Sequence, residues 1–296
     1  MPHNAAGGAL TAGEPESIEL PSVAILGAGA IGASLLRGLT KPSVTVNGTM
    51  QATCYSTSRA ADLSRFPQVH AACLQENPAA NKNAVLHADL VVLAVSPDLI
   101  PAVTSDICDS LKPGALVVSV AAGVTLARLQ TMLPVSATVI RALPNMGGEV
   151  GFGVTGVGRN ECCTEEQLGT VSGLFRTIGT VVAVGDDKLD AVSSLSGTGP
   201  GYFYFFVEQL TATGVELGFS QEQARAFAEQ TFLGSAALMH SSGRAPSELL
   251  GIFTAPDGTS IKAIEQLSNA DLGKVLLKAT SASISRAREI AAETGE

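Results

Sequence analysis

The chain has 296 residues, of which 46% are hydrophobic and 15% are charged, and its net charge at pH 7 is −9. This length allows two domains and a sizeable core, whereas the negative charge argues against nucleic acid and anionic membrane surfaces as general partners. The most apolar runs, at 90–95 and 202–207, are far shorter than the ~20 residues that span a bilayer, so no membrane span is predicted.

Residues 1–20 lack the basic start and apolar core of a signal peptide, and their Gly, Pro and Glu content predicts a flexible tail. The cysteines are Cys54, Cys73, Cys108, Cys162 and Cys163. Their odd number and the lack of a C-x-x-C pair indicate neither a disulfide framework nor a zinc cluster. We therefore expect no metal, a reducing compartment and a cytoplasmic location.

The first half alternates short β-branched runs with helical or loop segments. This alternation predicts an α/β fold with a mostly parallel, Rossmann-like, doubly wound sheet. The expected strands lie at 22–27, 52–56, 89–95, 115–121, 137–143, 151–158 and 180–185. Thr164 and Gln167 form a capping-box pattern that predicts a helix through Ile178.

From Asp186 onward the pattern is helical, with helices expected at 188–195, 200–217, 220–241 and 271–293; the third opens on a second capping box, Ser220 with Gln223. The sequence thus predicts a dinucleotide-binding domain at 21–185 and an all-helical dimerisation and substrate domain at 186–296. The stretch "GYFYFFVEQL" is apolar nearly all round, which suits either a core helix within one chain or a helix between two subunits.

Gly27, Gly29 and Gly32 follow the first expected strand and open a helical pattern. In the dinucleotide fingerprint such glycines provide a tight turn, close approach to the pyrophosphate, and helix-to-strand packing. The pyrophosphate would then bind at a helix N-terminus. The alternative is a glycine-rich turn that binds nothing.

The second expected strand indicates which dinucleotide binds. An NAD-specific site usually has an acidic residue there, but none occurs between Glu19 and Asp62. The strand runs instead into Ser56, Ser58 and Arg59, whose hydroxyls and guanidinium could bind a 2′-phosphate. NADPH is therefore predicted over NADH, the alternative being a polar turn with a solvated arginine.

Five further stretches occur in a characteristic order: "LAVSP" (93–97), "VVSVAAGVT" (117–125), "IRALPNMG" (140–147), "LSGTGPGYFYFFVEQL" (195–210) and "APDGTSIKAIEQL" (255–267). Together with the glycine triplet they resemble the motifs of the pyrroline-5-carboxylate reductase family. The resemblance covers essentially everything after the tail, and its most specific pieces are "SVAAGVT", "SGTGP" and the Pro-x-Gly-Thr-Ser loop.

The resemblance implies an NAD(P)H-dependent reductase that adds hydride to the imine carbon of 1-pyrroline-5-carboxylate to give L-proline, in a dimer whose helical domains interlock. It implies that the loop of Asp257, Gly258, Thr259 and Ser260 binds the substrate, with the Ser260 hydroxyl facing the imine nitrogen as the catalytic contact. The cofactor residues it implies beyond the glycines and Ser56–Arg59 are Ala30, Ile31, Val95, Ser96, Pro97, Ala121, Ala122, Gly123 and Asn145.

The residues themselves are compatible with this chemistry. An iminium is already electrophilic, so hydride transfer to it needs positioning more than a strong acid or base. The four histidines, His3, His70, His87 and His240, fall outside the matched motifs. Without the family, Ser260 begins a helical pattern and could instead be only a helix cap, and the two roles can coexist.

The sequence departs from the family at Ala30-Ile31, Ser96, Met146-Gly147 and Asp257. Asp257 matters most, because in the family this loop supplies backbone N–H groups to the substrate carboxylate. A further carboxylate there would repel the substrate unless the Asp257 side chain turns away or caps the following helix. Three alternatives follow: a reductase of a different cyclic imine, a non-catalytic NADPH-binding homologue, and a β-hydroxyacid dehydrogenase. The last needs a lysine on the helix after "SGTGPG", and no lysine occurs between Gly199 and Gly218.

Overall fold

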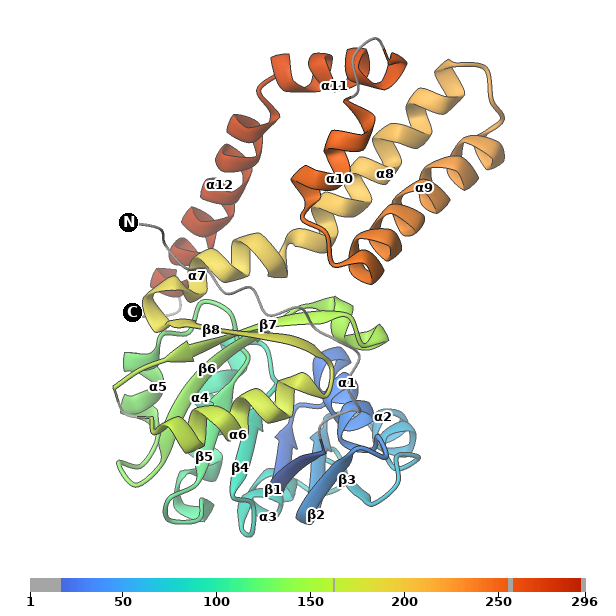
Figure 1. Ribbon diagram of the computed structural model, residues 1–296. Coiled ribbons are helices and arrows are strands. Elements are labelled where there is room, and N and C mark those ends of the chain that lie inside the picture. The colour runs from blue at the N-terminus through green and yellow to red at the C-terminus, as the bar shows by residue number, and fades with distance from the viewer. Residues whose placement is uncertain (1–16, 162, 255–257, 294–296) are drawn as a thin grey trace. The chain divides into compact units, whose positions relative to one another are not determined.

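The computed structural model describes residues 17–161, 163–254 and 258–293. The chain divides into an α/β unit, Ser17–Pro200 with the chain from Thr280 onward, and a helical unit, Gly201–Ala279 (Figure 1). The expected domain boundary after residue 185 stays a prediction. Of the expected tail, residues 1–16 lie outside the described residues, whereas Ile18 to Leu20 begin the first strand.

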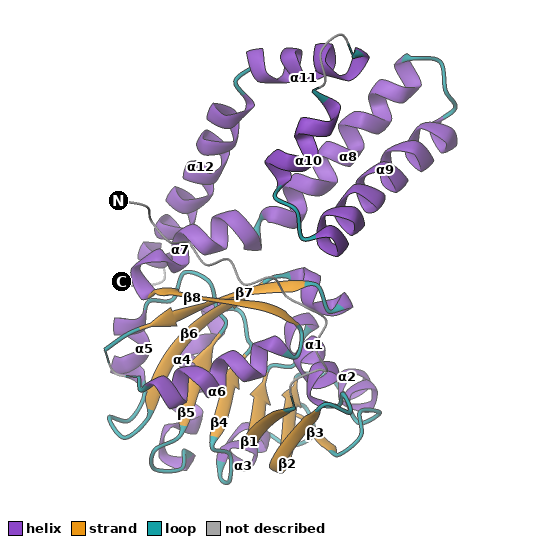
Figure 2. Cartoon of the chain, in the orientation of Figure 1, coloured by secondary structure: helices purple, strands orange, loops and turns teal. Residues whose placement is uncertain are grey.

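Within the described residues, the α/β unit is built on an eight-stranded sheet in the order β3-β2-β1-β4-β5-β6-β7-β8 (Figure 2). The strands are β1 (Ile18–Leu26), β2 (Val44–Cys54), β3 (Val69–Cys73), β4 (Leu90–Leu93), β5 (Leu116–Ser119), β6 (Thr138–Pro144), β7 (Gly153–Arg159) and β8 (Gly179–Gly185). Neighbouring pairs are parallel except β6 with β7. The doubly wound, Rossmann-like prediction is confirmed, although β3 was not anticipated.

Helices cover both faces of this sheet, namely α1 (Ala30–Leu39), α2 (Thr57–Leu63), α3 (Ala80–Val85), α4 (Ile100–Ile107), α5 (Leu126–Met132) and α6 (Glu165–Arg176). Successive strand residues point to opposite faces. Thus Val23 and Ile25 pack in one core with α1 and α6. Ala24 and Leu26 pack in the other with α3, α4 and α5.

The remaining helices are α7 (Leu189–Val192), which continues as a π-helix (Ser193–Gly197), α8 (Gly199–Glu216), α9 (Gln221–Ser242), α10 (Pro246–Phe253), α11 (Thr259–Asn269) and α12 (Leu272–Glu293). Both predicted capping boxes are present, Thr164 with Gln167 and Ser220 with Gln223. In the part of the chain that the structure describes, no helix combines the length and apolarity needed to cross a membrane.

The end of α12 is fastened to the α/β unit. The Ser194 hydroxyl donates to the Thr280 carbonyl at 2.8 Å. Arg288 lies 3.9 Å from Asp190. Asp190 in turn lies 3.7 Å from the buried guanidinium of Arg141, which also binds Asp186 at 3.1 Å. A chain of charges therefore runs from β6 through α7 to α12.

The apolar helix α8 is not a core helix within a single chain. Phe203, Tyr204 and Phe205 are 42%, 59% and 58% exposed. On neighbouring α9, Phe227 and Leu233 are each 60% exposed. Such a run of exposed large apolar side chains is typical of an interaction surface.

Candidate cofactor and substrate site

The residues predicted to bind the cofactor follow the carboxyl ends of five strands. Gly27 follows β1, Ser56 follows β2, Val95 follows β4, Ala121 follows β5 and Asn145 follows β6. These strands are parallel, so their carboxyl ends share one edge of the sheet. The strand order reverses direction between β1 and β4, and this switch point is where doubly wound sheets bind ligands.

The three fingerprint glycines occupy positions that restrict side chains in different ways. Gly27 has a φ of +77°, and an added Cβ would lie 2.2 Å from Val95 Cγ1. At Gly29 an added Cβ would meet only the Gly27 carbonyl oxygen, at 3.9 Å, which leaves the backbone open to a ligand. An added Cβ at Gly32 would lie 3.1 Å from Ile25 Cγ2, so the absence of a side chain at Gly32 allows α1 to pack closely on β1.

The N-terminus of α1 offers free amide donors. Its N-cap, Gly29, has no side chain to accept from them, and the first turn carries no acidic residue. The helix dipole adds partial positive charge at this end. Together with the open backbone at Gly29, these features fit a dinucleotide pyrophosphate.

Arg59 bends back over the glycine turn. Its Nε donates to the Ala28 carbonyl at 3.0 Å and its Nη2 to the Gly29 carbonyl at 2.6 Å. Its backbone N–H donates to Ser56 Oγ, which caps α2 and lies 3.3 Å from Ser58 Oγ. Arg59 is therefore not a merely solvated side chain, because two of its guanidinium nitrogens donate to backbone carbonyls of the glycine turn.

Two buried polar residues that the sequence analysis missed hold this turn in place. Thr53 accepts from the Gly27 N–H through its hydroxyl, at 3.4 Å, and from the Ala28 N–H through its carbonyl, at 2.7 Å. The Thr53 hydroxyl donates to Asn81 Oδ1 at 2.7 Å. Neither residue belongs to a motif, so only their burial in an apolar setting marks them.

At the other end of this edge, Asn145 fixes its neighbours. Its Nδ2 donates to the Ser196 carbonyl at 3.2 Å, and its Oδ1 accepts from the Val154 N–H at 3.0 Å. Asn145 thereby ties the π-helix, a form often found at functional sites, to the carboxyl end of β6. Its expected proximity to the reacting ring stays a prediction.

Ser260 is the second residue of α11, it is exposed, and Gly258 is the N-cap. The alternative interpretation of Ser260 as the helix cap is therefore wrong. Thr259 is the first residue of the same helix and is also exposed. Asp257 lies outside the described residues.

Two buried cysteines end the neighbouring strands β2 and β3. Cys54 and Cys73 are buried cross-strand neighbours on β2 and β3. Burial raises the pKa of the Cys54 thiol, nearby Cys73 raises it further, and Arg59 opposes the rise. Among the described residues, no cluster of three His, Cys, Asp or Glu side chains could hold a metal ion.

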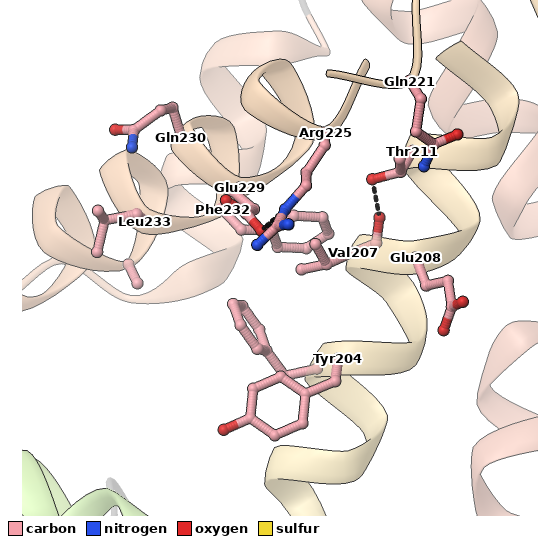
Figure 3. Close-up of a pocket in the computed structure, with 12 residues that line it drawn as sticks. Tyr204, Val207, Glu208, Thr211, Gln221, Arg225, Glu229, Gln230, Phe232 and Leu233 are labelled. Carbon is pink, nitrogen blue, oxygen red and sulfur yellow. Dashed lines mark hydrogen bonds and ion pairs between the residues drawn. The ribbon is translucent and has the colours of Figure 1, made fainter. Parts of the chain in front are cut away.

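A groove of about 630 Å³ lies in the helical unit between α8 and α9 (Figure 3). Its walls are mostly apolar, with Phe203 and Phe232 in edge-to-face contact at 5.4 Å between ring centroids. Arg225 and Glu229 form an ion pair of 2.6 Å within it. None of the predicted site residues lines it, and its apolar walls suit a protein partner better than a dinucleotide.

Two family models match the chain: pyrroline-5-carboxylate reductase dimerisation over residues 186–290, and NADP oxidoreductase coenzyme F420-dependent over residues 22–123. Pyrroline-5-carboxylate reductase of Mycobacterium tuberculosis is 32% identical, over 90% of this chain and 96% of the relative. That of Pseudomonas aeruginosa is 32% identical, over 93% and 99%. A solved pyrroline-5-carboxylate reductase of Coxiella burnetii has a TM-score of 0.80 at 29% identity, over 90% of this chain and 97% of that chain. The Plasmodium falciparum pyrroline carboxylate reductase, solved with NADP bound, has a TM-score of 0.73 at 21% identity, over 93% and 99%, which shows the fold.

Proposed function

The chain belongs to the pyrroline-5-carboxylate reductase family, and we infer that it uses NAD(P)H to reduce the C=N bond of 1-pyrroline-5-carboxylate, which gives L-proline. The whole-length likeness to reductases of this name is the observation that carries this inference. When bound, the cofactor supplies the hydride that adds to the imine carbon. The chain's own residues position the cofactor and the imine for hydride transfer and exclude water from them.

We assign the cofactor to the loops at the carboxyl edge of the sheet. Gly27, Gly29 and Gly32 admit the pyrophosphate to the N-terminus of α1. Ser56, Ser58 and Arg59 bind the 2′-phosphate, which makes NADPH the preferred donor. The remaining assigned residues are Ala30, Ile31, Val95, Ser96, Pro97, Ala121, Ala122, Gly123 and Asn145.

We assign the substrate to the start of α11, where Gly258 and Thr259 offer backbone amides and the Ser260 hydroxyl hydrogen-bonds the imine nitrogen. Ser260→Ala should lower kcat/KM by a factor corresponding to roughly 1–3 kcal/mol, with little change in NADPH affinity. Ser268→Ala, on the same helix, is the matched control and should behave as wild type. An unchanged kcat/KM in Ser260→Ala would remove Ser260 from the catalytic contacts.

We propose that the functional unit is a homodimer, or a higher homo-oligomer, formed through the helical unit. The exposed apolar faces of α8 and α9 support this, as does the match of this region to a dimerisation family model. The cytoplasmic location stays a prediction.

The activity is tested by following NADPH oxidation with 1-pyrroline-5-carboxylate and with uncharged 1-pyrroline, in wild type and Asp257→Gly. We expect wild type to reduce the carboxylate substrate, and Asp257→Gly to keep its KM or lower it modestly. The chain would be assigned to a different imine if the wild type reduced only uncharged 1-pyrroline and Asp257→Gly gained activity on 1-pyrroline-5-carboxylate. Bound cofactor without turnover of either ring would make it a non-catalytic homologue.

A further inference from the structure

Tyr55 lies at the end of β2, close to the residues assigned to the cofactor. It directly follows β2 and precedes Ser56, where an NAD-specific site usually has its acidic residue. The residue is 72% exposed. Among the described residues, no aromatic ring contact involves Tyr55.

The backbone of Tyr55 is fixed although its ring is free. Its carbonyl accepts from Cys73 Sγ at 3.0 Å and from the Gln75 N–H at 3.4 Å. The flanking Cys54 is buried and its Sγ donates to the Ser56 carbonyl at 3.4 Å. The end of β2 therefore presents a large aromatic ring from a rigid base, which keeps the entropy cost of ordering it on a ligand small.

The neighbouring groups define which part of a dinucleotide would meet this ring. The glycine turn and α1 suit the pyrophosphate, and Arg59 places its charge beside that turn. The adenosine end of a bound dinucleotide would then lie over the carboxyl end of β2. A tyrosine there lacks the carboxylate that would repel a 2′-phosphate, and it offers the adenine a π-face.

We propose that the Tyr55 ring stacks on the adenine of the bound cofactor and contributes equally to the affinity for NADPH and NADH. Tyr55 binds adenosine and Arg59 selects the phosphate. The proposal rests on the cofactor part of the proposed function and is independent of which imine is reduced.

The test measures dissociation constants by calorimetry for NADPH, NADH, 2′,5′-ADP and nicotinamide mononucleotide, which lacks adenine. Tyr55→Ala should weaken the first three by a common factor, about 5- to 100-fold as for other base–aromatic stacks, and leave the mononucleotide unchanged. Tyr55→Phe should stay within about twofold of wild type because it keeps the ring.

Val135→Ala removes an exposed apolar side chain before β6, at the opposite edge of the sheet, and is the matched control. Unchanged constants in Tyr55→Ala would overturn the proposal, as would a loss confined to NADPH or an equal loss in Tyr55→Phe, which would indicate a phosphate or hydroxyl contact instead. Weaker mononucleotide binding would also overturn it, by indicating a general defect. A chain that binds these nucleotides as expected but reduces no imine would refute the proposed function and leave the role of Tyr55 intact.

Discussion

At the scale of single residues, Arg59 combines two tasks. Its two bonds to the carbonyls of Ala28 and Gly29 brace the glycine turn against α2, and its charge suits a phosphate. A planar guanidinium can serve both because its donors point in fixed directions, whereas an ammonium is a point charge. Substitutions can therefore separate the charge from the brace.

Arg59→Ala should lower kcat/KM with NADPH by a factor corresponding to roughly 1.5–3 kcal/mol, the usual value of a hydrogen bond to a charged group, and should affect NADH less. Arg59→Lys should recover part of the NADPH preference through its charge. Steady-state kinetics with both donors measure this, with the exposed Arg65→Ala as control. Equal losses for NADPH and NADH would leave Arg59 with the brace alone.

Asp89 gives the fold a pH dependence. A hydrogen bond from Lys112, which is the larger cause, and a second from Ser22 hold the pKa of the Asp89 carboxyl below its usual value. A pKa that is lower in the folded than in the unfolded chain stabilises the fold above the unfolded pKa, which is near 3.9. That contribution disappears as the pH falls through the folded pKa.

Asp89→Asn should therefore lower the free energy of unfolding at pH 7, and lower it by less near pH 3. Urea unfolding at both pH values measures the difference, and Asp109→Asn, an exposed carboxyl on the same unit, is the control. A destabilisation that is equal at the two pH values would mean that the charge of Asp89 is not what stabilises the fold.

At the scale of elements, side-chain packing and helix propensity together decide how a glycine-to-alanine substitution in a helix changes stability. Gly38 lies near the end of α1, where an added Cβ would be 2.3 Å from Thr177 Oγ1 and 2.8 Å from Thr177 Cβ. At Gly169 in α6, an added Cβ would meet nothing within 4 Å. The same substitution should therefore have opposite effects at the two positions.

Gly38→Ala should destabilise the α/β unit by roughly 1–3 kcal/mol through overpacking, despite the better helix propensity of alanine. Gly169→Ala should instead stabilise it by roughly 0.5–1 kcal/mol, because the helix gains propensity without a clash. Chemical unfolding of both variants gives the comparison. Two changes of the same sign would show that propensity, or strain elsewhere, outweighs the local contact.

The same distinction explains how far the sequence predicted the elements. Long β-branched runs and capping boxes are local signals, so β4, β5, α6 and α9 were found. Only Val69 in β3 is a β-branched apolar residue, and that strand depends on its pairing with β2.

The glycine turn and Arg59 were found from a motif. Thr53 and Asn81 were not, because their role depends on a contact between segments 28 residues apart. Ser260 was placed near a helix start, yet the N-cap proved to be Gly258.

At the scale of the whole molecule, the helical unit exposes apolar side chains of α8 and α9 that no other part of the described chain covers. The groove between α8 and α9 has apolar walls with one ion pair inside (Figure 3). Apolar grooves of this kind suit a helix-like partner surface. We expect a second copy of the chain to cover it.

Sedimentation velocity should therefore find a dimer or larger species at micromolar concentration. Leu233→Glu, which places a charge on the groove wall, should weaken association, whereas Leu86→Glu on the α/β unit should not. A wild type that is monomeric and fully active would contradict the homo-oligomer.

The division of α12 has a consequence for biosynthesis. Its first turns belong to the helical unit, but from Thr280 onward it belongs to the α/β unit, where an added Cβ at Gly123 would lie 3.7 Å from the Ala287 carbonyl oxygen. In topological terms, the helical unit is an insertion within the α/β unit. The sheet and its six covering helices can form as the ribosome proceeds, but the nascent α/β unit waits for the insertion to be translated before the chain that completes it emerges. Its contacts with the chain from Thr280 onward thus form only after α8 and α9 have been translated.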